Sequence, residues 1–288
     1  MLLTAMVIIV ILIVFAALIY IVPYLRYQTA KLTEGTDTSH IVSVGHRGAA
    51  AHAPENTLAG FRKAMEIGVD FIELDVHLTQ DHQVVVIHDA NTKRTTGVDA
   101  AVADLTLSEI KKMDAGTWFD EEFANERVPT LSEALQLING RCQVMIEIKW
   151  PKKGIYEQIV EEIVKIIDQH AAASWVVIQS FEPAYLREIY EIRPSLTIHQ
   201  LLIGDAVLLP VYQGRSFHFG SFSPVAGVKS VNVYCIYLNE SMKKQYGVYE
   251  LGVFTVNTEE AITRSIANGA TYIISDRPEL VKKFKDTD

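Results

Sequence analysis

The stretch FIELDVHLTQDHQVVVIHD, residues 71–89, decides the fold. It opens and closes with an apolar run, and the polar segment between them is too short for a crossover helix. A helical connection between parallel strands needs about a dozen residues or more. The stretch therefore predicts a β-hairpin. If Asp81 and His82 form a two-residue turn, the register brings Asp75 opposite His88 on one face.

Outward from this hairpin, short apolar runs alternate with amphipathic stretches along the whole chain. The further runs typical of strands are Ile41–Val44, Val144–Ile148, Val176–Ile178, Thr197–Ile203, Ser230–Tyr234, Leu251–Val256 and Thr271–Ser275. Helical spacing of apolar residues occurs in Thr57–Ile67, Leu131–Asn139, Tyr156–Gln169, Pro183–Glu191 and Glu259–Asn268. The alternation predicts an α/β fold with a mostly parallel sheet, and about eight strands in one domain favour a TIM-type (β/α)8 barrel.

The first segment of the chain, Met1–Val22, has no charged side chain. As a helix it is long enough to cross a hydrocarbon core of about 30 Å, and it lacks the basic start of a signal peptide. A buried N-terminal helix of the barrel is the alternative. The sequence thus predicts a transmembrane anchor at residues 1–25, a polar tether at 26–40 and a barrel at 41–288, which includes a small folded insertion at 89–128.

Composition limits the partners. The formal net charge of −9 at pH 7 argues against nucleic acid, whose phosphates are held by basic patches. Arg26 and Lys31 follow the apolar segment and no basic residue precedes it, which favours a single-pass cell-membrane protein with a cytoplasmic barrel. Cys142 and Cys235 lie in or beside apolar runs and are expected to be buried thiols rather than a disulfide.

Four clusters of polar residues lie at the C-terminal ends of apolar runs. Barrel enzymes carry their catalytic groups at this end of the strands. Charged side chains within apolar strands are costly to bury unless they are paired or bind a metal. The clusters are Gly45-His-Arg-Gly48, Ile72-Glu-Leu-Asp75, Val86-Ile-His-Asp89 and Ile146-Glu-Ile-Lys149.

Three of these residues predict a metal site. Glu73 and Asp75 are two apart on one strand and point to the same side, and Glu147 has the matching position on another strand. A ligand set of carboxylates suits one divalent cation, Mg²⁺ or Ca²⁺, better than Zn²⁺. The alternative is that these carboxylates pair with a buried cation, for which Lys149 is the obvious candidate.

Two histidines and two basic residues complete the predicted site. His46 and His88 would transfer protons near neutral pH, although a single histidine at a strand end is often only a hydrogen-bonded polar group. Arg47 and Lys149 would bind phosphate oxygens. Asn56 precedes the first helix after the anchor and is expected to cap it.

Taken together in order, these motifs resemble the glycerophosphodiester phosphodiesterase family. The resemblance implies a TIM-type barrel, metal ligation by Glu73, Asp75 and Glu147, and acid–base roles for His46 and His88. It also implies hydrolysis of glycerophosphodiesters to sn-glycerol 3-phosphate and an alcohol. The residues that carry it are His46-Arg-Gly48, Pro54-Glu-Asn-Thr57, Glu73-Leu-Asp75, His88-Asp89, Val128-Pro-Thr-Leu131, Glu147-Ile-Lys149, Gln179-Ser-Phe181, Thr255-Val-Asn257 and Ser275-Asp-Arg-Pro278.

Two other functions remain compatible with the sequence. A membrane-anchored barrel of this type would also suit lysophospholipid substrates, cleaved in the manner of a lysophospholipase D. A catalytically silent barrel that binds headgroups is the third possibility, but the presence of every predicted ligand and of both histidines argues against it. Residues 217–222 and 231–236 match no pattern of the family, so the pocket for the alcohol is undefined.

Overall fold

The computed structural model describes residues 2–33, 35–205 and 211–285. The predicted anchor, tether and barrel also include residues 1, 34, 206–210 and 286–288, which lie outside the described residues.

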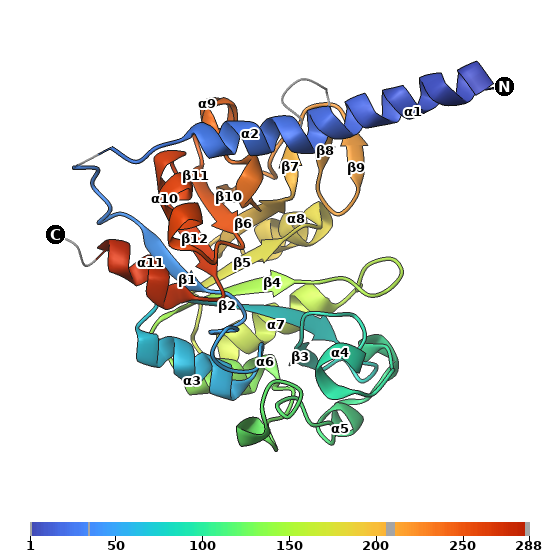
Figure 1. The fold of residues 1–288 in the computed structure, drawn as a ribbon. Coiled ribbons are helices and arrows are strands. Elements are labelled where there is room, and N and C mark those ends of the chain that lie inside the picture. Colours follow the sequence, from blue (N-terminus) through green and yellow to red (C-terminus); the bar gives the residue numbers. More distant parts are fainter. Residues whose placement is uncertain (1, 34, 206–210, 286–288) are drawn as a thin grey trace.

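Eight parallel strands in the described part of the chain close into a barrel, as the alternating pattern predicts (Figure 1). Their order around the barrel is the order in which the chain visits them, and the first strand pairs with both the second and the last. The strands are β1 (Val42–Gly45), β2 (Phe71–Leu78), β4 (Gln143–Ile148), β5 (Val176–Ser180), β6 (Thr197–Leu202), β10 (Val228–Tyr234), β11 (Glu250–Phe254) and β12 (Tyr272–Ser275).

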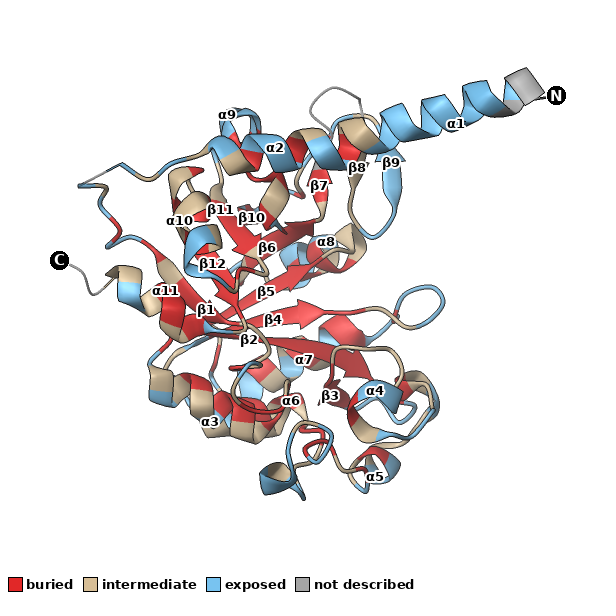
Figure 2. Ribbon diagram, in the orientation of Figure 1, coloured by how far each residue is buried: buried red, intermediate tan, exposed pale blue. Residues whose placement is uncertain are grey.

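Helices surround the barrel and bury one face each against it, so that the strands are almost wholly buried (Figure 2). The sequence predicts α3, α6, α7, α8 and α10 close to their observed positions, whereas it does not predict α9 and α11. The helices are α3 (Leu58–Ile67), α6 (Leu131–Ile138), α7 (Ile159–Gln169), α8 (Pro183–Ile192), α9 (Glu240–Tyr246), α10 (Glu259–Ala267) and α11 (Pro278–Lys285).

Two connections depart from the strand–helix alternation. After β2 the chain forms a hairpin with β3 (Val84–Val86) and then a compact excursion containing α4 (Lys93–Thr96) and α5 (Leu107–Ile110), which packs on its own apolar cluster. After β6 it forms a separate antiparallel sheet, β7 (Gly204–Asp205), β8 (Val211–Gln213) and β9 (Phe217–Phe219). Nothing in the sequence pattern predicts this second sheet.

The hairpin is present but its predicted register is wrong by one residue. The observed pairs join Val76 to Val86 and Leu78 to Val84, so Asp75 lies opposite Ile87 rather than His88. The turn contains three residues instead of two, and His82 within it has a φ of +56°. His88 nevertheless remains close enough to Asp75 to affect the pKa of that carboxyl.

The barrel interior changes from apolar to polar along the strands. Phe71, Met145, Val177 and Tyr272 belong to a buried apolar cluster toward the N-terminal ends. Because side chains alternate along a strand, the next inward positions lie two residues later, and there the chain places Glu73 on β2 and its counterparts on neighbouring strands. The polar layer thus lies on a closed apolar base and opens only at the C-terminal end.

The N-terminal helix continues beyond the predicted anchor. It comprises α1 (Leu2–Ala16), a π-helical turn at Ala17–Ile21 and α2 (Val22–Thr29), so it includes residues 26–29 of the predicted tether. Tyr27 is 3% exposed, and its hydroxyl donates a hydrogen bond to the Ala261 carbonyl oxygen, 2.9 Å away. The end of the helix is therefore docked on α10, whereas α1 is exposed (Figure 2).

A buried histidine makes the barrel sensitive to acid. His199 is fully buried, with its ring 4.9 Å from that of Tyr272. Burial lowers the pKa of His199 to about 3. As the pH falls, the unfolded chain binds a proton at His199 before the folded barrel does. The contribution of neutral His199 to folding stability is therefore fully present above its unfolded pKa of about 6.5 and is lost as the pH falls toward its folded pKa. We expect this residue to lower the free energy of unfolding by about 2 kcal/mol between pH 7 and pH 5.

Denaturant unfolding of the full chain and of His199→Phe at these two pH values tests the expectation. The substitution keeps a ring against Tyr272 and removes the titrating group. The variant should lose less stability than the parent on acidification. An equal loss in both proteins would place the acid sensitivity elsewhere.

Candidate active site

Two glycines shape the loop that carries His46 and Arg47. A Cβ atom at Gly45 would lie 2.2 Å from the Gly48 carbonyl oxygen, and one at Gly48 would lie 2.8 Å from the backbone carbon of Gly60 in α3. Gly48 also has a φ of +94°, which glycine adopts without strain. The loop thus turns tightly against α3 and holds both side chains at the C-terminal end of β1.

The three predicted ligands lie together inside the barrel mouth. β2 and β4 pair so that Asp75 is directly opposite Glu147. One oxygen from each of these residues and one from Glu73 lie within 4.8 Å of one another. Glu73 and Asp75 are each 1% exposed and Glu147 is 6% exposed. The strand pattern therefore predicted the convergence of these carboxylates correctly.

Lys149 lies at the same cluster, as the pairing alternative predicts. Its Nζ is 3.0 Å from Asp75 Oδ1 and 2.5 Å from Glu147 Oε1. Both oxygens are buried, and neither is assigned a hydrogen bond from any described residue, so their contact with Lys149 is an ion pair. Buried carboxylate oxygens without such partners are costly, and a bound cation would satisfy them. Lys149 therefore pairs with two of the cluster's oxygens, and a bound cation would share these oxygens with its ammonium group.

Burial and neighbouring charges shift the pKa values of the three carboxyl groups in different directions. Burial, Asp75 and Glu147 raise the pKa of Glu73 well above its usual range. Burial also raises the pKa of Glu147 to about 7, although Lys149 opposes the rise. Burial would raise the pKa of Asp75 too, but Lys149, His88 and Arg47 hold it far below the usual value. Two of the three carboxyl groups thus disfavour ionisation.

Arg47 bridges the carboxylates and the rim of the barrel. Its backbone N–H donates to Glu73 Oε2 at 2.9 Å, and its Nη1 donates to Glu55 Oε1 at 2.9 Å. Its Nε is 3.5 Å from Asp75 Oδ2. The guanidinium group is thus fixed beside the cluster, where one side of its fork would meet an anion bound at the carboxylates.

His46 is oriented by residues from the far end of the chain. Its Nδ1 is 2.6 Å from Asp276 Oδ1, and Asp276 Oδ2 accepts a hydrogen bond from Asn257 Nδ2 at 2.6 Å. Arg47 Nε donates to the other ring nitrogen, His46 Nε2, at 3.3 Å. These contacts correspond to the tautomer with the proton on Nδ1, which leaves Nε2 beside Arg47 to exchange protons.

His88 has a similar environment just after the end of β3, which pairs with β2. Its Nδ1 is 2.6 Å from Asp89 Oδ1, and Asp89 Oδ2 accepts a hydrogen bond from Arg94 Nε at 2.7 Å. Arg94 also donates to Glu55, the residue that holds Arg47. Burial lowers the pKa of His88, and Asp75 opposes the shift only in part. The imidazole is therefore favoured in its neutral form at pH 7.

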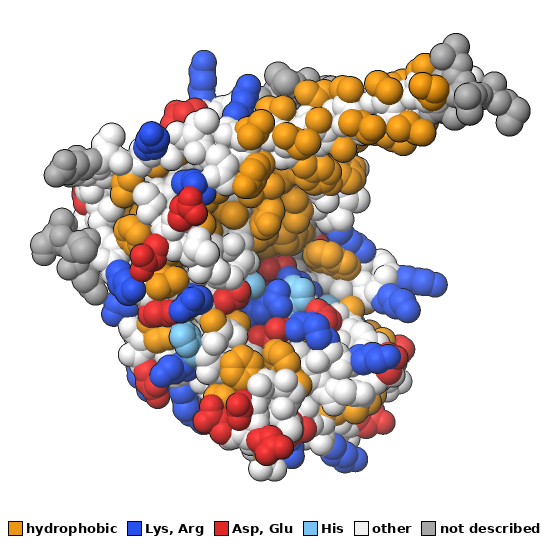
Figure 3. Space-filling view, viewed as in Figure 1, with side chains coloured by type: hydrophobic (Ala, Val, Ile, Leu, Met, Phe, Trp, Pro, Cys, Tyr) orange, Lys and Arg blue, Asp and Glu red, His pale blue; other side chains and the backbone are white. Residues whose placement is uncertain are grey.

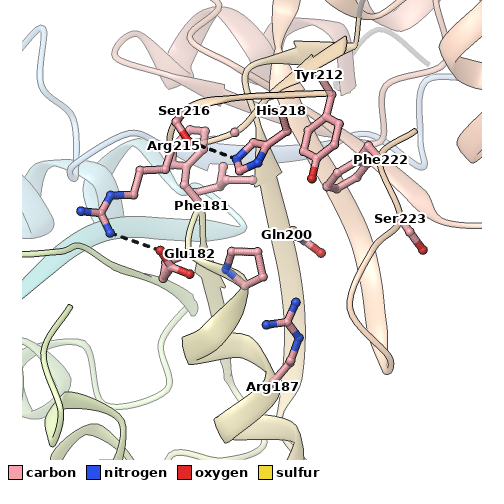
Figure 4. Close-up of a pocket in the computed structure, with 13 residues that line it drawn as sticks. Phe181, Glu182, Arg187, Gln200, Tyr212, Arg215, Ser216, His218, Phe222 and Ser223 are labelled. Atoms are coloured by element: carbon pink, nitrogen blue, oxygen red, sulfur yellow. Dashed lines mark hydrogen bonds and ion pairs between the residues drawn. The ribbon is translucent and has the colours of Figure 1, made fainter. Parts of the chain in front are cut away.

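Two cavities meet at Phe181, beside the cluster. One, of about 350 Å³, is lined by His88, Lys149 and Trp150 as well as Phe181. The second, which we call the side pocket, measures about 480 Å³ and lies between α8, β6 and the small sheet (Figure 4). Its lining includes Phe181, Glu182, Arg187, Tyr212, Arg215 and His218. A polar space therefore lies next to the cavity at the cluster, and Phe181 lines both.

The predicted helix cap is wrong. Thr57 caps α3, because its side chain accepts a hydrogen bond from the Gly60 N–H. Asn56 instead donates from Nδ2 to Asp75 Oδ2 at 2.8 Å and accepts from the Asp75 N–H at 3.2 Å. Asn56 therefore positions a carboxylate of the cluster. Capping propensity alone does not distinguish two adjacent cap formers.

Sequence reasoning assigned no role to Asp276, Asn257, Glu55 or Arg94. Asp276 and Asn257 follow the ends of β12 and β11, so the criterion that selected the other clusters would also have selected them. Glu55 and Arg94 lie in the loop before α3 and in α4, and sequence offers no comparable signal for their pairing. The predicted residues themselves all lie at the barrel mouth.

Comparison with known proteins agrees with this geometry. Residues 46–280 match the model of the glycerophosphoryl diester phosphodiesterase family. A glycerophosphodiester phosphodiesterase of Caldanaerobacter subterraneus is 39% identical over 82% of this chain and 94% of its own length. The structure of an Oleispira antarctica phosphodiesterase in complex with its product sn-glycerol 3-phosphate has a TM-score of 0.71, with 25% identity over 85% of this chain and 96% of that chain. The rat lysophospholipase D GDPD1 is 26% identical over 84% and 85% of the two chains.

Proposed function

Because the chain belongs to the glycerophosphoryl diester phosphodiesterase family, we propose that it cleaves glycerophosphodiesters to sn-glycerol 3-phosphate and an alcohol, with His46 and His88 as acid and base. The proposal rests on the two imidazoles at the barrel mouth. Each is paired with a carboxylate, and both lie near the cluster of buried acidic residues. One group removes a proton from the nucleophile and the other supplies one to the leaving oxygen.

The buried carboxylates fit one divalent cation, Mg²⁺ or Ca²⁺. Glu73, Asp75 and Glu147 would hold it, because hard cations prefer such oxygen ligands and the cluster includes buried oxygens without hydrogen bonds. When bound, the cation would stabilise negative charge that develops on the phosphate oxygens. Arg47 and Lys149 lie beside the cluster and would contact the same phosphate.

The histidines would act in two steps. In the first, one imidazole accepts the proton of the glycerol 2-hydroxyl, whose oxygen attacks phosphorus, while the other protonates the departing alcohol. The product is a cyclic glycerol phosphate. In the second step the proton transfers reverse, and water opens the ring to give glycerol 3-phosphate. Direct attack by water is the alternative route, and it does not need the 2-hydroxyl.

The test is release of glycerol 3-phosphate by the full chain in detergent micelles. Tyr27 is buried on the barrel, so truncation after the helix would expose an apolar surface. We expect turnover of glycerophosphocholine or glycerophosphoethanolamine with Mg²⁺ or Ca²⁺, and loss of turnover with chelator. The 2-deoxy analogue should resist cleavage if the cyclic route operates. Turnover of that analogue would exclude the cyclic route and indicate direct attack by water. Inactivity on all diesters would contradict the proposal.

Lysophospholipids are the second candidate substrates. The helix Met6–Thr29 is long and apolar enough to cross a membrane, and lies outside the matched residues 46–280. We propose that it anchors the enzyme as a single pass, with Arg26 and Lys31 favouring a cytoplasmic barrel. An active site held at a bilayer would have access to lysophospholipids. These lipids contain the same glycerophosphodiester group as the water-soluble substrates. Comparing lysophosphatidylcholine with glycerophosphocholine in the same assay separates the two.

A further inference from the structure

Two aromatic side chains of the small sheet are unusually exposed. Phe219 is 87% exposed and Phe217 is 48% exposed. Both belong to β9, two residues apart, and therefore point to the same side. We call this surface the β9 face. The free-energy cost of exposing apolar side chains to water rises with their exposed area. A patch of this kind therefore indicates a surface that binds a partner.

The two sides of the small sheet have different surroundings. Tyr212 and His218 are paired across β8 and β9, their rings stack with 4.9 Å between centroids, and both line the side pocket (Figure 4). Phe217 and Phe219 alternate with His218 and so lie on the opposite side. The sheet is therefore a wall between the pocket beside the active site and the β9 face.

The β9 face adjoins the N-terminal helix. Val211 is the cross-strand partner of Phe219, and cross-strand partners share a side of the sheet. Val211 is buried in contact with Ile19 of the helix. Figure 3 shows hydrophobic side chains covering α1 and continuing below it toward a hollow in which acidic, basic and histidine side chains gather.

The helix places this contact at the edge of a bilayer. Burial of the helix against the barrel begins at Ile19 and recurs at Pro23 and Tyr27, on one helical face. The helix before Ile19 is about 25 Å long, close to the thickness of a hydrocarbon core of about 30 Å. Tyr20 and Tyr24, 44% and 47% exposed, lie at the same level, where aromatic side chains are enriched.

We propose that the β9 face is a second membrane contact, which lies in the interface of the bilayer that holds the N-terminal helix. The contact orients the wall of the side pocket, and with it the mouth of the active site, toward lipid. The inference rests on the proposed anchoring, and its link to substrate rests on the proposed activity. A bilayer is the occupant because the face is continuous with a helix whose exposed apolar side chains themselves require lipid.

Fluorescence quenching tests the contact without catalysis. The full chain carrying Phe219→Trp is reconstituted in phosphatidylcholine vesicles with and without brominated phosphatidylcholine. We expect bromine to reduce the emission of the added tryptophan by about twofold or more, because interfacial side chains reach the acyl boundary. Val98→Trp is the matched control, since Val98 is 43% exposed and follows α4, across the barrel from α1 in Figure 1.

Equal, weak quenching at the two positions would overturn the proposal. So would a dimer that shields Trp at position 219 from bromine, because the occupant would then be a second copy of the chain. In a separate arm, Phe217→Ser with Phe219→Ser should reduce turnover of vesicle-borne lysophosphatidylcholine by about tenfold and leave glycerophosphocholine turnover within about twofold. Equal loss on both substrates would contradict the orienting role. If the parent cleaves neither substrate, the proposed activity fails, while quenching still decides the contact.

Discussion

Replacing His46 or His88 with alanine is expected to lower kcat for glycerophosphocholine by about 10²- to 10⁴-fold, the usual contribution of a positioned proton-transfer group. Each ring is held through Nδ1 by a carboxylate at 2.6 Å, so each loss removes an oriented group rather than a mobile one. Steady-state release of glycerol 3-phosphate by the full chain measures the effect. KM should change little, because neither imidazole supplies the charge that binds phosphate.

A better leaving group distinguishes the two histidines. In a glycerophosphodiester of p-nitrophenol the p-nitrophenolate leaves without needing a proton, so the variant that lacks the acid of the first step should recover much of the rate of p-nitrophenolate release. The variant that lacks the base should remain impaired on both substrates. Recovery in neither variant, or in both, would contradict the division of roles.

His52→Ala is the matched control. His52 lies in the same loop as His46, and its Nε2 is 2.9 Å from Glu279 Oε2, so it too pairs with a carboxylate near the C-terminus. It is not among the residues that line either cavity at the cluster. We expect the substitution to leave kcat within about twofold, since it removes no group from the site. A loss as large as that of His46→Ala would indicate a structural effect of the loop.

The sequence predicted that the three carboxylates lie together because the relevant signal is local. Glu73 and Asp75 are two residues apart in an apolar run, and alternation alone directs both side chains inward. The parallel pairing that brings Glu147 opposite Asp75 follows from the barrel itself. Where strand alternation and strand ends determine position, reading residues in order was sufficient.

The predictions of the hairpin register and of the helix cap were wrong because single side-chain contacts decide between similar local structures. The hairpin register depends on a three-residue turn, in which Thr79 Oγ1 donates to Asp81 Oδ1 at 2.6 Å and accepts from the Gln83 N–H at 2.9 Å. Apolar alternation does not encode these bonds. Asn56 and Thr57 both suit a helix cap, and only the position of Asp75 decides between them.

The small sheet was missed for a different reason. β7, β8 and β9 are two or three residues long, which is too short for a periodic pattern to emerge. The sheet is nevertheless the element that separates the side pocket from the β9 face.

Glu147→Gln is expected to abolish the effect of metal on stability. In the parent, Mg²⁺ or Ca²⁺ at about 100 times its Kd should raise the free energy of unfolding by about 2.7 kcal/mol, because the folded barrel binds the ion and the unfolded chain does not. The variant lacks one of three buried ligands and relieves part of the repulsion that raises the pKa of Glu73. It also removes the ion pair of Glu147 with Lys149, so its metal-free form should be close in stability to the parent's, although its activity is lost.

Thermal unfolding of the full chain with chelator and with added cation measures both effects, independently of catalysis. Glu55→Gln is the control, because Glu55 lies beside the site and pairs with Arg47 and Arg94 but is not in the ligand cluster. It should keep the stabilisation by metal. If the parent unfolds at the same temperature with chelator and with cation, the buried carboxylates do not bind the ion. In that case Lys149, at 3.0 Å from Asp75 Oδ1, would be their permanent counter-charge.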